Sequence, residues 1–183
     1  MGVMLVDTRL TYQDLTAIPD DGKRHEIING EHLVTAAPLK RHQLAVQNLS
    51  FALDSFVRAA HLGRVFGCPV DVVLSDYDVV EPDVIVVLKG RLSQHNERNF
   101  QGAPDIVVEV LSQSTAMRDR GDKLKLYAKH GVEEYWIVDA DAQSIDAYCF
   151  HKDDPGPRTL RPADALTSCL LPGFEIRVAA IFI

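Results

Sequence analysis

Long apolar runs and closely spaced cysteines are both absent from the sequence. No apolar segment is long enough to cross a membrane, and the first ten residues lack the charged start and long apolar centre of a signal peptide. The three cysteines, Cys68, Cys149 and Cys169, form no CxxC pair. Their spacing indicates neither a zinc site nor a disulfide framework, and we expect free thiols in a cytoplasmic protein without membrane contacts.

Positive charge is scarce as well. The 19 lysines and arginines are outnumbered by 26 aspartates and glutamates, so the formal net charge is −7 at pH 7. This balance argues against a broadly cationic surface that coats nucleic acid, but it leaves room for a local basic rim around an acidic, metal-binding centre. No Gly-rich phosphate loop is present, because the segment GRVFGC has neither the lysine nor the spacing of that motif.

The composition that remains is that of one globular domain. Apolar residues make up 46% of the chain and charged residues 25%, and 183 residues are enough to bury a sizeable core. We expect a single domain over residues 1–183, with an N-terminal hairpin extension at 11–38, a core at 40–150 and a C-terminal strand extension at 151–183.

Local signals predict the first elements. Thr11 is placed to cap a short helix, and Asn29-Gly30 between two extended runs is a strong signal for a β-hairpin. After Pro38, apolar residues recur at helical spacing up to Gly63, which predicts a long amphipathic helix with Gly63 as its stop.

The middle of the chain predicts a sheet. Segments 64–74 and 79–88 flank the turn-like tetrapeptide SDYD and are interpreted as two strands of one hairpin, and segment 101–112 is apolar enough to be a central strand covered on both faces. A helix at 115–131 and a strand at 133–140 follow. This order predicts an α/β fold with a mixed central sheet flanked by helices.

Two of the predicted strands carry acids where burial is costly. The segment EPDVIVV begins with Glu81 and Asp83 around a proline, and the segment APDIVVEVLSQST holds Glu109 inside an apolar run. A buried carboxylate is unfavourable unless it is paired or bound to a metal ion. If the two strands are neighbours with Asp83 opposite Glu109, both carboxylates come within reach of one Mg²⁺ ion.

Other polar residues have a structural interpretation beside the functional one. Asp83 alone could cap a turn beside its proline, and Asp71 could join the acidic group or border the edge of the sheet. Asp105 shares the strand face of Glu109 and could support it. His42, on the apolar face of the long helix, is more simply a hydrogen-bonded core residue than a ligand.

These motifs resemble the Uma-two family, the restriction endonuclease branch of the PD-(D/E)XK nuclease superfamily. The matching segments run through nearly the whole chain in order: RHEIINGE, RHQ, PVDVVLSDYDVVEPDVIVV, APDIVVEVLSQST, RDRGDKLKLYAKHGVEEYWIVD and LPGFEI. The resemblance implies a restriction-endonuclease-like core preceded by a β-hairpin.

The resemblance also implies a set of site residues. Asp83 and Glu109 would bind Mg²⁺ or Mn²⁺. The lysine of the superfamily motif is replaced by Leu111, and the family pattern places it instead at Lys123 in the following helix, where it would assist attack by water. Glu31 matches a family glutamate and is a candidate further acid, although a solvated hairpin residue is an equally good interpretation.

Helical spacing tests the choice of lysine. Tyr127, one turn after Lys123, and Asp119 and Arg120, one turn before it, are expected on the face of Lys123. Lys125 is the competing lysine and lies on another face.

The leading expectation is a Mg²⁺-dependent endonuclease that hydrolyses DNA, acting as a homodimer because nucleases of this fold often cut duplexes as symmetric pairs. One alternative is a non-catalytic or regulatory scaffold that keeps the fold, which the net negative charge and the displaced lysine favour. Another is a metal-dependent hydrolase of small phosphate esters.

Overall fold

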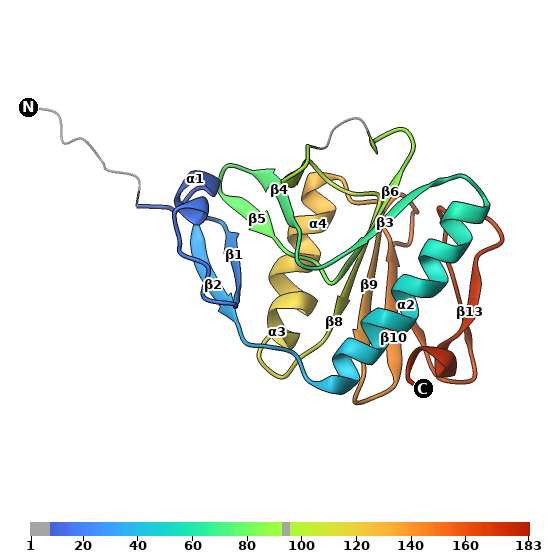
Figure 1. Cartoon of the computed structure of the whole chain (residues 1–183). Helices are drawn as coiled ribbons and strands as arrows, with labels where there is room; N and C mark the ends of the chain where they lie inside the picture. Colours follow the sequence, from blue (N-terminus) through green and yellow to red (C-terminus); the bar gives the residue numbers. More distant parts are fainter. Residues whose placement is uncertain (1–7, 93–95) are drawn as a thin grey trace, which may run out of the picture.

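The described chain folds into two large β-sheets and a two-stranded ribbon, with helices on both sides of the larger sheet (Figure 1). This computed structural model describes residues 8–92 and 96–183. The larger, central sheet has the strand order β11-β10-β9-β8-β6-β3, and the second sheet has the order β2-β1-β5-β4-β7.

The elements have the following bounds. The central sheet contains β3 (Gly63–Gly67), β6 (Val84–Leu88), β8 (Ile106–Val110), β9 (Glu134–Asp139), β10 (Ser144–Cys149) and β11 (Arg158–Leu160). The second sheet contains β1 (Arg24–Ile28), β2 (Glu31–Thr35), β4 (Asp71–Ser75), β5 (Asp78–Val80) and β7 (Asn99–Gln101). The helical segments are α1 (Tyr12–Thr16), α2 (Lys40–Ala59), α3 (Ala116–Arg118), the π-helical turn η2 (Asp119–Lys123), α4 (Leu124–His130) and the 3₁₀ turn η3 (Val178–Ile181). A ribbon of β12 (Ala165–Thr167) and β13 (Glu175–Arg177) completes the described chain.

The central sheet is mixed and covered on both faces. Strands β8 and β9 run parallel, whereas β6 runs antiparallel to β8. Helix α2 packs on one face, and α4 packs on the other together with residues of the second sheet (Figure 1). Because both faces are buried, every residue of β8 is buried, as expected for a central strand.

The local signals at the start of the chain are confirmed. The side chain of Thr11 accepts a hydrogen bond from the backbone N–H of Asp14 and caps α1. At the predicted hairpin turn, Asn29 and Gly30 both have positive φ angles, of 54° and 82°, which a tight two-residue turn requires. The hairpin is part of the second sheet, because β1 also pairs with β5.

The predicted hairpin of segments 64–74 and 79–88 is confirmed in its antiparallel pairing, but it is interrupted and shared between the two sheets. Each segment is divided into two strands: β3 pairs with β6 in the central sheet, and β4 pairs with β5 in the second sheet. The divisions coincide with Pro69 and Pro82, which cannot donate a hydrogen bond to a sheet. The division places Asp83 at the point where the two sheets separate.

Two further expectations need correction. Helix α2 ends at Ala59, and the residue with a positive φ angle after it is His61, at 54°. Gly63, the predicted stop of this helix, is instead the first residue of β3.

Of the three expected free thiols, only Cys68 is free, because Cys149 and Cys169 form a disulfide. These two residues lie 20 positions apart and meet only after the chain has passed through β11 and β12.

No helix within the described residues is long and apolar enough to cross a membrane.

The position of Gly63 generates a prediction about stability. A Cβ atom at this residue would collide with the backbone carbonyl oxygen of Val87 on β6, whereas a Cβ atom at Gly90 would meet nothing within 4 Å. We expect Gly63→Ala to destabilise the fold by about 1–3 kcal/mol, the usual cost of overpacking. Gly90→Ala, the matched control, should be neutral or stabilising by less than about 1 kcal/mol. Urea denaturation measures both, and equal free energies of unfolding would contradict the close approach of β3 and β6.

Candidate active site

A cavity of about 450 Å³ opens where the two sheets separate. It draws its lining from both sheets, from α2 and from η2. The titratable residues among that lining include Arg24 and Glu26 of β1, His42 of α2, Glu81 and Asp83 before β6, Glu109 of β8, and Asp119 and Lys123 of η2.

Asp83 and Glu109 lie side by side in this cavity, as predicted. Val84 pairs with Val108 in the antiparallel register of β6 and β8, which brings the preceding Asp83 next to Glu109. Both side chains are about 2% exposed. Asp83 accepts hydrogen bonds from the backbone N–H of Val110 and from Arg24, each at 2.8 Å. Its side chain is therefore held in place from two directions.

Lys123 completes the predicted group. Its ammonium donates hydrogen bonds to Oε1 of Glu109 at 2.8 Å and to Oε1 of Glu26 at 2.7 Å. It also lies 3.9 Å from Oδ1 of Asp119. Tyr127, one turn along, donates a hydrogen bond to the same Oε1 of Glu109 at 2.7 Å. The competing Lys125 is exposed.

The turn that carries Lys123 is not an ordinary helical turn. Residues Asp119–Lys123 form the π-helical segment η2 between α3 and α4. Both of its end residues, Asp119 and Lys123, are buried. Single π-helical turns occur often at functional sites, where they redirect side chains. Here the wider turn directs an acid and a lysine into the same cavity.

The charges of the site are unevenly compensated. Burial favours a neutral amine at Lys123, but the carboxylates of Glu109, Glu26 and Asp119 outweigh it and raise the pKa of Lys123. One ammonium cannot offset all of these acids. Burial, together with the neighbouring charges of Asp119, Asp83 and Glu26, raises the pKa of Glu109 to about 8 although Lys123 opposes the shift.

Asp83 is in the opposite situation. Burial acts to raise the pKa of Asp83, but the hydrogen bond from His42 and the positive charge of Arg24 prevail and lower it. Nε2 of His42 lies 3.2 Å from Oδ2 of Asp83. The site thus combines one carboxylate that ionises readily with a second, Glu109, that retains a proton near neutral pH unless another cation is present.

Two buried polar atoms of the cavity have no hydrogen-bond partner within the described chain. They are Oδ1 of Asp119 and Nδ1 of His42. A buried polar atom without a partner is costly, so such atoms indicate a place for water or a ligand. A hard divalent cation prefers carboxylate oxygens, and it would also relieve the repulsion between the acids. The donor set of the cavity therefore fits Mg²⁺ or Mn²⁺.

Glu31, the predicted further acid, lies outside this group. It is exposed at the start of β2, opposite Ile28, and does not line the cavity. Glu26, from the adjacent strand of the same hairpin, supplies the acid that contacts Lys123. The hairpin was therefore identified correctly as a source of an acid, but the wrong glutamate was selected.

The remaining candidates are spread over the fold. Nε2 of His42 contacts Asp83, so this residue belongs to the site and is not only a core residue.

Asp71 accepts a hydrogen bond from the hydroxyl of Tyr12, and Asp105 accepts one from the backbone N–H of Leu88 and pairs with Arg91. Neither Asp71 nor Asp105 lines the cavity. Arg120, expected on the face of Lys123, pairs instead with Asp139 and Asp146.

Glu26, Arg24 and a site role for Asp119 were not predicted from the sequence. A usable signal exists for Glu26, which stands beside two isoleucines in RHEII and is only 1% exposed. Glu109 in IVVEV was identified from a related signal, namely an acid next to β-branched apolar residues in a predicted strand. No local signal identifies Arg24, because its partner Asp83 is 59 positions away in the sequence.

Comparisons with known proteins agree with this architecture. A family model, Uma2, described as "Putative restriction endonuclease", matches residues 11–179. A solved structure described as "a putative nuclease belonging to DUF820", from Anabaena variabilis, superimposes with a TM-score of 0.79, and the match covers 94% of this chain and 97% of that one. At 19% identity this likeness concerns the fold, and it confirms the predicted restriction-endonuclease-like α/β class.

A curated relative matches over a shorter stretch. An uncharacterized protein of Synechocystis sp. is 41% identical over 76 residues, which are 41% of this chain and 38% of that protein. The match thus spans well under half of the relative's length.

The raised pKa of Glu109 predicts how stability depends on pH in the metal-free protein. The pKa of Glu109 is 4.5 in the unfolded state and about 8 in the folded state. Between these two pH values, the folded state binds a proton that the unfolded state has lost. The stabilisation from this proton is complete below about pH 4.5 and disappears as the pH rises through about 8, with a slope of at most about 1.4 kcal/mol per pH unit. Urea denaturation in the presence of a chelator should therefore show a steeper loss of stability for the wild type than for Glu109→Gln. The exposed Glu175→Gln is the control and should keep the wild-type slope. Identical slopes for the wild type and Glu109→Gln would contradict the burial of an ionisable Glu109.

Proposed function

The chain belongs to the Uma2 family, and on this basis we propose that it is a metal-dependent endonuclease that hydrolyses phosphodiester bonds in DNA. The observation that carries the proposal is the convergence of Asp83, Glu109 and Lys123 in one cavity at the junction of the sheets. Nuclease chemistry needs oxygen ligands for a metal ion and a cation near the scissile phosphate, and the carboxylates and the lysine ammonium of this cavity are groups of these two kinds.

Asp83 and Glu109 are the residues that would hold Mg²⁺ or Mn²⁺. Asp119, whose Oδ1 accepts no hydrogen bond within the described chain, lines the same cavity. When bound, such an ion polarises a phosphoryl oxygen and lowers the pKa of a bound water molecule. The carboxylate of Glu109 is kept in a fixed orientation by the hydroxyl of Tyr127, and that of Asp83 by Arg24 and the Val110 N–H. Fixed ligands avoid the cost of reorganising the site during the reaction.

Lys123 contributes a fixed positive charge. An ammonium group has three donors, and Glu26 and Glu109 accept two of them, so one remains to face the substrate. Its raised pKa keeps the amine protonated at neutral pH, which suits it to stabilise charge that develops on a phosphate rather than to act as a base. Glu26 positions this amine, because it accepts a hydrogen bond that holds the amine between Glu26 and Glu109.

Specific observations favour two other functions. The carboxylate oxygens of Asp83 already accept protein hydrogen bonds, and Lys123 offsets part of the acidic charge, which would suit a non-catalytic scaffold that is stable without metal. The volume of about 450 Å³ also lies within the usual range of small-molecule sites, which would suit a hydrolase of small phosphate esters. Homodimer formation and a cytoplasmic location stay predictions.

Two lysines of the same helical segment test the proposed role of the charge. Lys123→Ala should lower the rate of DNA cleavage about a hundredfold or more, because one electrostatic stabiliser of the transition state is lost. Lys125→Ala is the matched control, since Lys125 is exposed, and it should cleave at the wild-type rate. Nicking of a supercoiled plasmid in Mg²⁺ or Mn²⁺ measures the rate, and circular dichroism verifies that each variant is folded.

The same assay separates the three functions. Wild-type protein that hydrolyses small phosphate esters but cuts neither DNA nor RNA would favour the small-ester hydrolase. Protein that is folded and binds metal but cleaves no substrate would favour the scaffold. Loss of cleavage in Lys125→Ala with full activity in Lys123→Ala would contradict the assignment of the lysine.

Metal binding generates a separate prediction. Saturating Mg²⁺ or Mn²⁺ should raise the melting temperature of the wild type, since a ligand at one hundred times its Kd stabilises the native state by about 2.7 kcal/mol. Glu109→Gln should lose most of this shift because it removes a charged ligand. Glu31→Gln should keep it, because Glu31 is exposed and outside the cavity. Equal shifts in the wild type and Glu109→Gln, measured by thermal denaturation, would place the ion elsewhere.

A further inference from the structure

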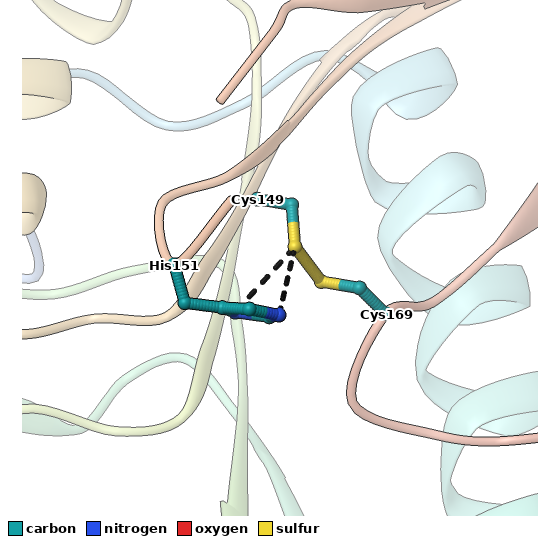
Figure 2. A group of neighbouring side chains, drawn as sticks. All are labelled: Cys149, His151 and Cys169. Carbon is teal, nitrogen blue, oxygen red and sulfur yellow. Dashed lines mark hydrogen bonds between the residues drawn. A yellow bond between two sulfur atoms is a disulfide. The ribbon is translucent and has the colours of Figure 1, made fainter. Parts of the chain in front are cut away.

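A second group of metal-ligating side chains lies outside the active-site cavity. Cys149, His151 and Cys169 bring their ligand atoms within 4.8 Å of one another (Figure 2). Both ring nitrogens of His151 lie 3.5 Å from Sγ of Cys149. The group is partly open to solvent, since the cysteines are half-buried and His151 is exposed. None of the three residues lines the cavity that holds Asp83 and Glu109.

The backbone around both cysteines is held by contacts other than the disulfide. Cys149 ends β10, and its N–H and carbonyl groups bond to Pro155 and Lys152, which fixes the turn that returns His151 to the cysteine. The backbone N–H of Cys169 donates to the carboxylate of Glu134 at 3.2 Å, and the neighbouring Ser168 hydroxyl donates to it at 2.6 Å. Glu134 is only 3% exposed. The two sulfur atoms should therefore remain neighbours when the bond between them is absent.

The spacing of the group suits a tetrahedral ion. The Cα atoms of the two cysteines are 6.7 Å apart, which is at the wide end of the range of about 4.4–6.8 Å found in disulfides and leaves room for the sulfur atoms to separate. Zinc binds sulfur at about 2.3 Å and nitrogen at about 2.0–2.1 Å, so two such ligands at a tetrahedral angle are about 3.6 Å apart. The sulfur–nitrogen distance of 3.5 Å between Cys149 and His151 agrees with that value.

We propose that Cys149, His151 and Cys169 form a Zn²⁺ site when the disulfide is reduced. A dithiol reductant supplies two electrons and two protons, which break the sulfur–sulfur bond and give two thiols. Zn²⁺ then displaces the two thiol protons and forms two bonds to sulfur and one to a ring nitrogen of His151. The fourth position is open to water.

The carboxylate of Glu133, which lies beside His151, supports this assignment. Oε2 of Glu133 lies 4.0 Å from Nδ1 of His151. A carboxylate beside one ring nitrogen favours the tautomer that presents the other nitrogen to a metal ion, an arrangement common around zinc-bound histidines. Thiolate and imidazole ligands select zinc over Mg²⁺, so this site and the carboxylate site take different ions.

The proposed ion would have the same mechanical effect as the disulfide. Cys169 lies in the segment between β12 and β13, and Cys149 lies at the end of β10. A bond through zinc would attach this segment to the central sheet under reducing conditions, in which a disulfide does not persist.

Cobalt provides a spectroscopic test on the full chain. The protein is reduced with a phosphine, freed of reductant without oxygen, and titrated with Co²⁺, whose thiolate complexes absorb in the near ultraviolet. We expect the thiolate absorption to saturate at one thiolate-bound Co²⁺ per reduced chain, to disappear when Zn²⁺ displaces that ion, and to be absent from the oxidised chain. Cys169→Ser should lose the thiolate absorption, and His151→Ala should weaken binding. Cys68→Ser is the matched control and should bind as the wild type does, because Cys68 is the free cysteine and is not part of the group.

Several results would overturn the proposal. They are a reduced wild type without thiolate absorption, a Cys169→Ser variant that keeps it, and a His151→Ala variant with unchanged affinity. A fourth is a reduced chain that no longer melts cooperatively and does not recover when Zn²⁺ is added. Because Mg²⁺ gives no thiolate absorption, none of these results bears on the proposed nuclease site.

Discussion

The candidate site depends on one buried ammonium group. Lys123 contacts Glu109 of the central sheet, Glu26 of the second sheet and Asp119 of its own π-helical turn, and thus links both sheets to that turn. A buried charge is tolerated only when it is paired and hydrogen-bonded, so neither the lysine nor these acids could be buried without the others. The pairing leaves an excess of negative charge. Burial and the neighbouring acids together raise the pKa of Glu109, and a divalent cation in the cavity would therefore be stabilising. The interaction that holds the site together is therefore also the source of the charge excess on which the proposed metal binding depends.

Much of this arrangement could be predicted from the sequence because it follows from periodicity and local turns. The motif positions and strand alternation led to the expectation that Asp83 and Glu109 meet if their strands are neighbours, and the register of β6 and β8 brings them together. The helical period placed Tyr127 with Lys123 and placed Lys125 away from it. The hairpin at Asn29 and the cap at Thr11 are signals contained within a few residues. The resemblance to a family then supplied the one connection that periodicity cannot make, between strand β8 and the lysine of the following helix.

Several features that were missed depend on contacts between segments that are far apart in the sequence. Pro69 and Pro82 were visible, but no local rule says that the strands on either side of them join different sheets. Glu31 was preferred to Glu26 because it follows the turn and matches a family position, whereas the burial of Glu26 exists only once β1 lies against β5 and η2. The meeting of Cys149 and Cys169 likewise requires the chain to return through β11 and β12. In each case the residues can be recognised in the sequence, but the contact between them exists only in the folded chain.

The central claim is that the acids beside Lys123 hold a divalent ion. Anomalous diffraction from crystals grown with Mn²⁺ tests it most directly, since manganese scatters anomalously and the protein carboxylates do not. We expect one anomalous peak within coordination distance of both Asp83 and Glu109, at about 2.0–2.5 Å from their oxygens, and no peak there in crystals of Glu109→Gln. An ordered site without a peak at saturating Mn²⁺, with Lys123 still bonded to Glu26 and Glu109, would contradict the account and leave a closed network of charges that serves the fold alone.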